Sequence, residues 1–198
     1  FNTSWMDPGA ELFLLFGKDR TSIIAYPKNG KVSWALVKAN KFFQQRRKDR
    51  SKRRDHPELR GVGERCVVGF GSSGGPPMMN VLYNNHYQIV QSPGYVMIMA
   101  EMVHDARVIR LDGKHPPEYI TPWLGDSIGH WEGNTLVVET TNFNPQHTFR
   151  AGLRHFFAIT SGAIVTERFT RTSKDQILYR FYIDDPDIYS QVWAGEMP

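Results

Sequence analysis

The chain has 198 residues, of which 40% are hydrophobic, 22% charged and 13% aromatic, a composition typical of one folded globular domain. No apolar run approaches the roughly 20 residues that a membrane helix needs, which argues against a membrane span. The net charge is +4, but residues 46–54, RRKDRSKRR, hold seven basic residues and one acidic one, so the remaining 17 basic and 19 acidic residues give −2. Nucleic-acid-binding surfaces usually spread their basic residues, so nucleic acid is not an expected partner.

The first third of the chain predicts a short strand, a helix and a long loop. The strand is predicted at RTSIIAYP, which is followed by an Asn29-Gly30 turn. The helix is predicted over residues 37–56, which are rich in helix formers and are followed by Pro57. We expect 37–56 to be a solvated basic helix or arm, and the alternatives are contact with a nucleic acid, an anionic membrane or an acidic partner. Residues 57–82 are a Gly/Pro-rich covering loop with the single cysteine, Cys66, which we expect to be a buried thiol and which leaves no intrachain disulfide.

From Tyr83 onward, short runs of β-forming residues alternate with turn signals. This spacing predicts about eight antiparallel strands in one domain, residues 1–198, and an up-and-down β-barrel is the favoured architecture. VMIMAEMV is apolar on both faces, as expected for a barrel strand that lines an apolar lumen. The expected strands cover residues 87–91, 95–103, 106–113, 128–131, 135–143, 162–171, 176–185 and 189–197.

Three of these strands each carry one glutamate. Alternation places Glu101 with Met97 and Met99, Glu139 with Val137, and Glu167 with Phe169. A carboxylate in an apolar lumen has a raised pKa, which suits general acid or base catalysis. The alternative is that Glu139 and Glu167 lie on the solvent face, paired with arginines of neighbouring strands.

The segment EMVHDAR adds a second acid–base candidate at a strand–turn–strand junction. His104 beside Asp105 can serve as a base and its orienting carboxylate at a barrel mouth. The alternative is that Asp105 caps the turn backbone, a common role of aspartate. The predicted catalytic residues are therefore Glu101, His104, Asp105, Glu139 and Glu167.

Aromatic, amide and basic side chains on the same strands are candidates for substrate binding. We expect arginines to hold an anionic group and aromatic rings to shape the pocket. No cofactor is expected, and no metal, because the GHWEG segment supplies two ligand types but no third by spacing. The candidates are Asn85, Tyr87, Met99, Arg107, His130, Trp131, Arg168, Phe169 and Tyr179.

Several stretches resemble a family of bacterial, often exported, proteins. The resemblance is carried by RTSIIAYPKNGKV, GGPPM, YNNHYQIVQSPGYVMIMAEMVHDARVI, WLGDSIGHWEGNTLVVETTNF and VTERFTR. It implies a periplasmic or secreted location, with a cytoplasmic one as the alternative, and brings no activity with it. The chain departs from the family pattern at IIAYPKNG, where Asp-Pro-Pro is usual, and in its basic segment. A more distant likeness in architecture is to phenolic acid decarboxylases of lipocalin-like fold, which use Tyr, Arg and Glu.

These observations predict a cofactor-independent acid–base enzyme of lyase, isomerase or cyclase type. Its substrate would be a small hydrophobic or aromatic molecule in the lumen of a lipocalin-like barrel. The alternatives are a carrier of a hydrophobic ligand without catalysis, and an interaction protein that uses residues 46–54. Assembly into a homo-oligomer is compatible with the sequence.

Overall fold

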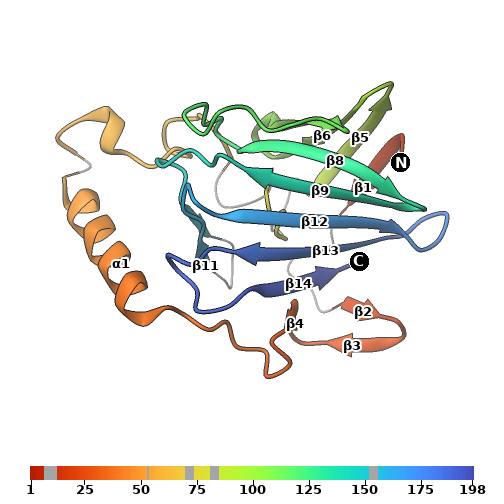
Figure 1. Cartoon of the computed structure of the whole chain (residues 1–198), viewed down its shortest axis with the longest axis horizontal. Coiled ribbons are helices and arrows are strands. Elements are labelled where there is room, and N and C mark those ends of the chain that lie inside the picture. Colours follow the sequence, from red (N-terminus) through yellow and green to blue (C-terminus); the bar gives the residue numbers. More distant parts are fainter. Residues whose placement is uncertain (7–12, 53, 70–73, 81–84, 152–155) are drawn as a thin grey trace.

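The computed structural model describes residues 1–6, 13–52, 54–69, 74–80, 85–151 and 156–198. Within these ranges the protein is mainly β with one α-helix, as the sequence predicts (Figure 1). The main sheet holds β1 (Thr3–Met6), β4 (Ile24–Tyr26), β5 (His86–Ser92), β6 (Tyr95–Ala100), β7 (Ala106–Leu111), β8 (Asp126–Glu132), β9 (Thr135–Thr141), β12 (Ile164–Arg171), β13 (Ile177–Asp184) and β14 (Trp193–Met197). Two small hairpins pair β2 (Phe13–Leu15) with β3 (Lys18–Arg20) and β10 (Phe149–Ala151) with β11 (Phe156–Ala158).

The ten strands of the main sheet lie in the order β1-β5-β6-β7-β8-β9-β12-β13-β14-β4. Most neighbours are antiparallel, but β7 and β8 are parallel because residues 112–125 cross back before β8 begins. The prediction of an entirely antiparallel up-and-down order is therefore wrong at this pair. No ladder between β1 and β4 is recorded among the described residues, so the closed barrel stays a prediction.

The sheet is strongly curved, and its concave face carries the core. Arg107 on β7 contacts Glu167 on β12, although β8 and β9 lie between their strands. On a flat sheet, strands three steps apart would be separated by about 14 Å. Inward side chains alternate with outward ones on each strand, as Val165, Glu167 and Phe169 do on β12.

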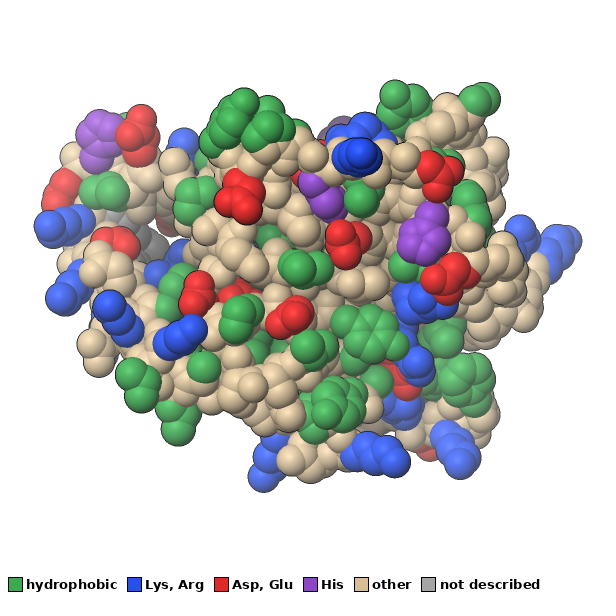
Figure 2. Space-filling model, viewed as in Figure 1, with side chains coloured by type: hydrophobic (Ala, Val, Ile, Leu, Met, Phe, Trp, Pro, Cys, Tyr) green, Lys and Arg blue, Asp and Glu red, His purple; other side chains and the backbone are tan. Residues whose placement is uncertain are grey.

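The α-helix, α1 (Leu36–Ser51), stands at one end of the sheet (Figure 1). It is polar around most of its surface, and its attachment is small: Ala39 is buried, and the Phe43 ring lies 5.7 Å from that of Trp34, which contacts Tyr189 at 5.1 Å. The Lys38 ammonium also lies 3.2 Å from an Asp187 carboxylate oxygen. Lys and Arg side chains gather over α1 and along the lower edge in Figure 2.

The helix ends at Ser51, before the predicted end at residue 56, and a 3₁₀ turn at Pro57–Leu59 comes later in the chain. No helix of the described residues is long and apolar enough to cross a membrane. The predicted loop 57–82 is irregular where it is described, and residues 70–73, 81 and 82 lie outside the described residues. Cys66 is exposed, so the prediction of a buried thiol is wrong; the left-handed backbone at this residue (φ 54°) belongs to a turn.

Candidate functional site

A cavity of about 280 Å³ lies against the concave face of the sheet. Its walls come from β1 and β5 at one end of the strand order and from β12, β13 and β14 toward the other, so the curvature of the sheet creates it. The lining is mostly apolar, with aromatic rings and methionines predominating. The lining residues are Trp5, Met6, Met78, Met79, Tyr87, Ile89, Phe169, Asp175, Gln176, Ile177, Tyr179, Met197 and Pro198.

Behind one wall of the cavity lies a buried polar cluster of Tyr179, Glu167 and Arg107. The Tyr179 hydroxyl donates to Glu167 Oε1 at 2.7 Å and accepts from the Met78 backbone N–H at 2.9 Å. The Arg107 guanidinium donates to both carboxylate oxygens of Glu167, with 3.0 Å between Nη2 and Oε1. Tyr179 lines the cavity, whereas the side chains of Glu167 and Arg107 are 0% and 2% exposed.

Strand register explains how this cluster forms. On β12 and β13, Phe169 lies opposite Tyr179 and Glu167 opposite Phe181, so Glu167 and Tyr179 are diagonal neighbours on the concave face. The Pro-rich segment that contains Met78 and Met79 packs against this face and supplies the backbone donor to Tyr179.

The electrostatics of the cluster favour a fixed, net-neutral arrangement. A buried carboxylate is costly unless it is paired, and Glu167 receives a bidentate pair from Arg107 and a third bond from Tyr179. Burial, together with the adjacent Glu167 charge, raises the pKa of Tyr179 well above its usual value. Tyr179 is therefore a protonated hydrogen-bond donor at neutral pH.

The structure brings five of the residues predicted from sequence to this region. Tyr87, Phe169 and Tyr179 line the cavity, and Arg107 and Glu167 form the cluster behind Tyr179. The sequence predicted that Arg107 holds an anionic ligand. In the structure, both of its terminal nitrogens bond to Glu167 instead.

The other acid–base candidates near β6 and β7 lie away from the cavity lining. Glu101 is exposed and lies 3.0 Å from His86 Nδ1, and the exposed His104 has a left-handed backbone (φ 60°) in the turn before β7. Asp105 accepts a hydrogen bond of 2.7 Å from the backbone N–H of Gly69, which lies 36 residues earlier in the chain, so this bond ties the turn to the loop before it instead of capping the turn itself.

The GHWEG segment is the end of β8 and the first residue of the turn to β9, and Glu132 lies opposite Thr135 where the hairpin closes. Glu139 follows it on the convex face, with its side chain 50% exposed, so it does not reach the cavity. His130 and Arg168 are also on the convex face and both contact Glu132. Trp131 is 39% exposed and packs against Phe1.

Two further binding candidates lie outside the cavity lining. Met99 alternates with the buried Ile98 and Ala100 and therefore faces the convex side of β6. Asn85 is half-buried just before β5 begins.

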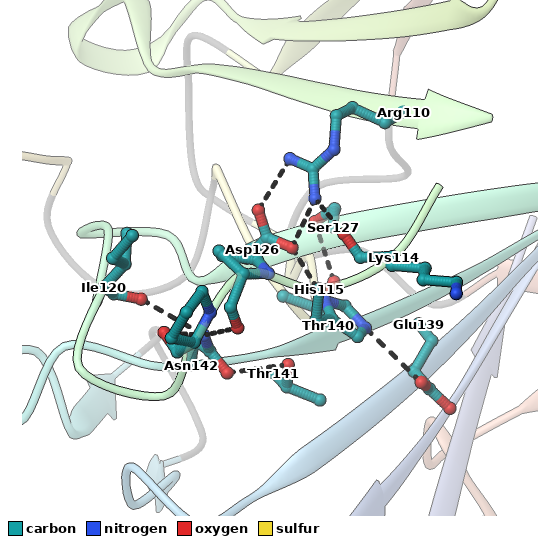
Figure 3. Close-up of polar contacts among 12 residues, drawn as sticks. Arg110, Lys114, His115, Ile120, Asp126, Ser127, Glu139, Thr140, Thr141 and Asn142 are labelled. Carbon is teal, nitrogen blue, oxygen red and sulfur yellow. Dashed lines mark hydrogen bonds and ion pairs between the residues drawn. The ribbon is translucent and has the colours of Figure 1, made fainter. Parts of the chain in front are cut away.

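A second polar network lies on the convex face (Figure 3). Asp126 accepts two hydrogen bonds of 2.8 Å from Arg110 and lies 2.7 Å from His115 Nδ1, while His115 Nε2 is 3.4 Å from Glu139. Asn142 donates from its amide to the carbonyls of Pro116, Pro117 and Ile120, each at 3.2 Å. These contacts anchor the crossing segment, residues 112–125, to β8 and β9.

Sequence reasoning missed much of the cavity lining. Met78 and Met79 come from the expected loop and Met197 from the expected last strand, whereas the sequence predicted no element around Trp5. The Pro-Pro-Met-Met sequence offered one signal, since paired methionines in a polar loop indicate an apolar surface to cover.

Among the described residues, no group of three or more His, Cys, Asp or Glu side chains is placed to hold a metal ion. Comparison with known protein families, curated proteins and solved structures finds no match to this chain. The resemblance noted from the sequence therefore stays a prediction.

Proposed function

We propose that this protein binds a small, uncharged aromatic or hydrophobic molecule in the cavity on the concave face. The observation that carries the proposal is a cavity of about 280 Å³ with a mostly apolar lining and the Tyr179 phenol in its wall. An apolar cavity of roughly 150 Å³ accepts benzene, so one about twice that size suits two fused rings.

The charges around the cavity support an uncharged ligand. Arg107 and Glu167 neutralise each other behind the wall, and Arg168 lies on the opposite face of the sheet, where it pairs with Glu132. A carboxylate on the ligand would lose its hydration without gaining a free cation from these arginines. This differs from the anion-binding role that the sequence predicted for Arg107 and Arg168.

The lining also supports an aromatic ligand. Met6, Met78, Met79 and Met197 contribute flexible, polarizable thioethers, which contact aromatic rings favourably and adapt to their shape. Tyr87, Phe169 and Trp5 add ring faces and edges.

Calorimetric titration with matched probes tests the proposal. We expect 2-naphthol to bind at least about tenfold more tightly than 2-naphthoate, which corresponds to about 1.4 kcal/mol for burying the carboxylate. An Ile177→Trp variant should lose binding because the larger side chain fills the cavity. Ile164→Trp, on the convex face of β12, is the matched control. Equal affinity for the two probes, or binding that survives in Ile177→Trp, contradicts the proposal.

A second proposed function is acid–base catalysis of lyase, isomerase or cyclase type on the bound molecule. It is favoured by the 2.7 Å hydrogen bond from Tyr179, in the cavity wall, to the buried Glu167 carboxylate. Tyr179 would supply the proton by turning its O–H from Glu167 to the reacting atom of the ligand, and the Met78 N–H and the Arg107 charge would stabilise the phenolate that is left.

Variants at Tyr179 separate the two proposed functions. If the protein is an enzyme, Tyr179→Phe should lower kcat by about 100-fold or more while ligand affinity changes only a few-fold. If it is a carrier, the bound molecule is recovered unchanged from wild type and variant alike. Export to the periplasm or secretion remains a proposal that rests on the resemblance, and cell fractionation with an antibody tests it.

A further inference from the structure

The outward side chains of β5, β6 and β7 form an apolar surface on the convex face. These three strands are antiparallel neighbours in regular register, so their outward residues line up in rows across the strands. Six of the nine side chains in three successive rows are apolar or aromatic, and one is charged. The rows, which together we call the outer patch, are Gln88, Met99 and Ala106; Val90, Met97 and Val108; and Ser92, Tyr95 and Arg110.

The convex face has a different composition on the far side of β7. Its outward residues there include His130 and Glu132 on β8, Glu139 on β9 and Arg168 on β12. Arg168 and His130 both contact Glu132, so charges pair within and across these strands. A sheet face that meets water is normally polar in this way. The outer patch therefore departs from the rest of the same face.

Solvent reaches the apolar side chains of the outer patch. Val90, Tyr95 and Val108 are 37%, 49% and 53% exposed, and Met97 and Met99 are partly exposed. Single exposed apolar side chains are ordinary on a protein surface, whereas adjoining ones mark a contact surface. The core and the cavity lie on the concave face, so neither accounts for this patch.

We propose that the outer patch is the contact surface with a second copy of this chain. A surface with one charge among nine residues fits a partner surface that is itself apolar, because charged groups would lose their hydration there. The outer patch is a surface of that kind, and a two-fold axis lets it serve both copies. Met97 is the central residue, so an axis that runs across the strands through Met97 places it against its counterpart.

This axis also matches the edges of the outer patch. It turns the second copy so that Arg110 lies over Ala106 of that copy, beside its Glu101, and not over the other Arg110. The Arg110 and Glu101 side chains are 36% and 48% exposed, so each can approach the opposite charge. Met99 meets Tyr95 of the second copy, a favourable contact between a thioether and a ring. Nine residues are less than half of one side of a standard interface, which predicts a weak dimer.

Sedimentation velocity of the intact protein over a concentration series tests the proposal. We expect a monomer–dimer equilibrium with a Kd on the order of 10–100 μM. Val108→Lys should raise this Kd about tenfold or more, because the symmetry introduces two ammonium groups into one apolar contact. Ile164→Lys is the matched control: Ile164 is 41% exposed on the convex face of β12, outside the outer patch, and its replacement should leave the Kd unchanged.

A measurement on the wild-type protein keeps the test decisive if Val108→Lys does not fold. The methyl resonances of Met97 and Met99 should shift with protein concentration, with the same midpoint as the sedimentation data. The methyl resonance of Met79, which is buried in the cavity lining, should not shift. A protein that stays monomeric up to about 1 mM overturns the proposal and means that a different protein covers the patch. A dimer whose Kd is unchanged in a folded Val108→Lys variant, or whose formation leaves the Met97 and Met99 resonances in place, also overturns it and means that the copies meet elsewhere.

Discussion

Arg107 and Arg110 lie three residues apart on β7 and point to opposite faces of the sheet. Each donates two hydrogen bonds to one carboxylate, Arg107 to Glu167 on the concave face and Arg110 to Asp126 on the convex face. The Arg107 and Glu167 side chains are 2% and 0% exposed, whereas those of Arg110 and Asp126 are 36% and 8% exposed. The same chemistry therefore has different consequences. Removing one residue of the concave pair is costly because the other charge stays buried without a partner. The strength of the convex pair depends on salt and pH because solvent reaches it.

The largest effect should come from breaking the concave pair. Arg107→Met removes one charge and leaves Glu167 buried without its ion partner, so we expect the free energy of unfolding to fall by about 3–5 kcal/mol. Urea denaturation measures it. The double variant Arg107→Met/Glu167→Leu removes both charges and should recover most of the loss. A single variant that loses less than about 1 kcal/mol would mean that water reaches the pair.

A smaller loss is expected from Tyr179→Phe. This change removes the donor to Glu167 Oε1 and the acceptor of the Met78 N–H, while Arg107 still pairs with Glu167. We expect a loss of about 1–3 kcal/mol in the free energy of unfolding, since a buried amide N–H is left without its acceptor. Tyr182→Phe, at the neighbouring outward position of β13, is the control and should cost less. Equal losses in the two variants would show that the cluster adds no stability.

The convex pair should respond to acid. Burial raises the pKa of Asp126, but hydrogen bonds from Arg110 and His115 outweigh it and hold this pKa below its usual value. A carboxyl with a depressed folded-state pKa contributes stability above its unfolded pKa, about 3.9, and loses it as pH falls toward the folded value. Unfolding free energies between pH 6 and pH 2.5 should therefore fall less steeply in Asp126→Asn than in wild type. Parallel curves would argue that Asp126 is not favourably paired in solution.

The smallest effect should come from Glu139→Gln. Its carboxylate is half-exposed and 3.4 Å from His115 Nε2, and exposed pairs contribute about 0–1 kcal/mol. We expect stability to change by less than about 0.5 kcal/mol and naphthol binding to stay at the wild-type level. A clear loss of naphthol binding in this variant, measured by calorimetry, would contradict the prediction and show that Glu139 takes part in ligand binding.

The sequence predicted the faces of some strands and not of others, for a physical reason. On β12 and β13, polar and apolar residues alternate, so the shared face of Glu167 and Phe169 was predicted correctly. On β9, Leu136, Val137 and Val138 are all buried, so alternation alone could not tell which face Glu139 shares with the core. The pairing of Arg107 with Glu167, 60 residues apart, depends on sheet curvature, which local patterns do not encode.

The pairing of β4 with β14 sets a condition on how the chain reaches this structure. Tyr26 lies opposite Ala194, so β4, the strand at the end of the sheet order, is synthesised early and must wait for β14, which is the last strand of the chain. Closing a loop of that length costs entropy before any contact repays it, and pairings between distant residues slow folding. During synthesis, residues 24–26 emerge long before their partner exists, and the edge of β13 that β14 later covers is open until the end. This edge is where a folding chain would be most exposed to pairing with a second copy or a chaperone.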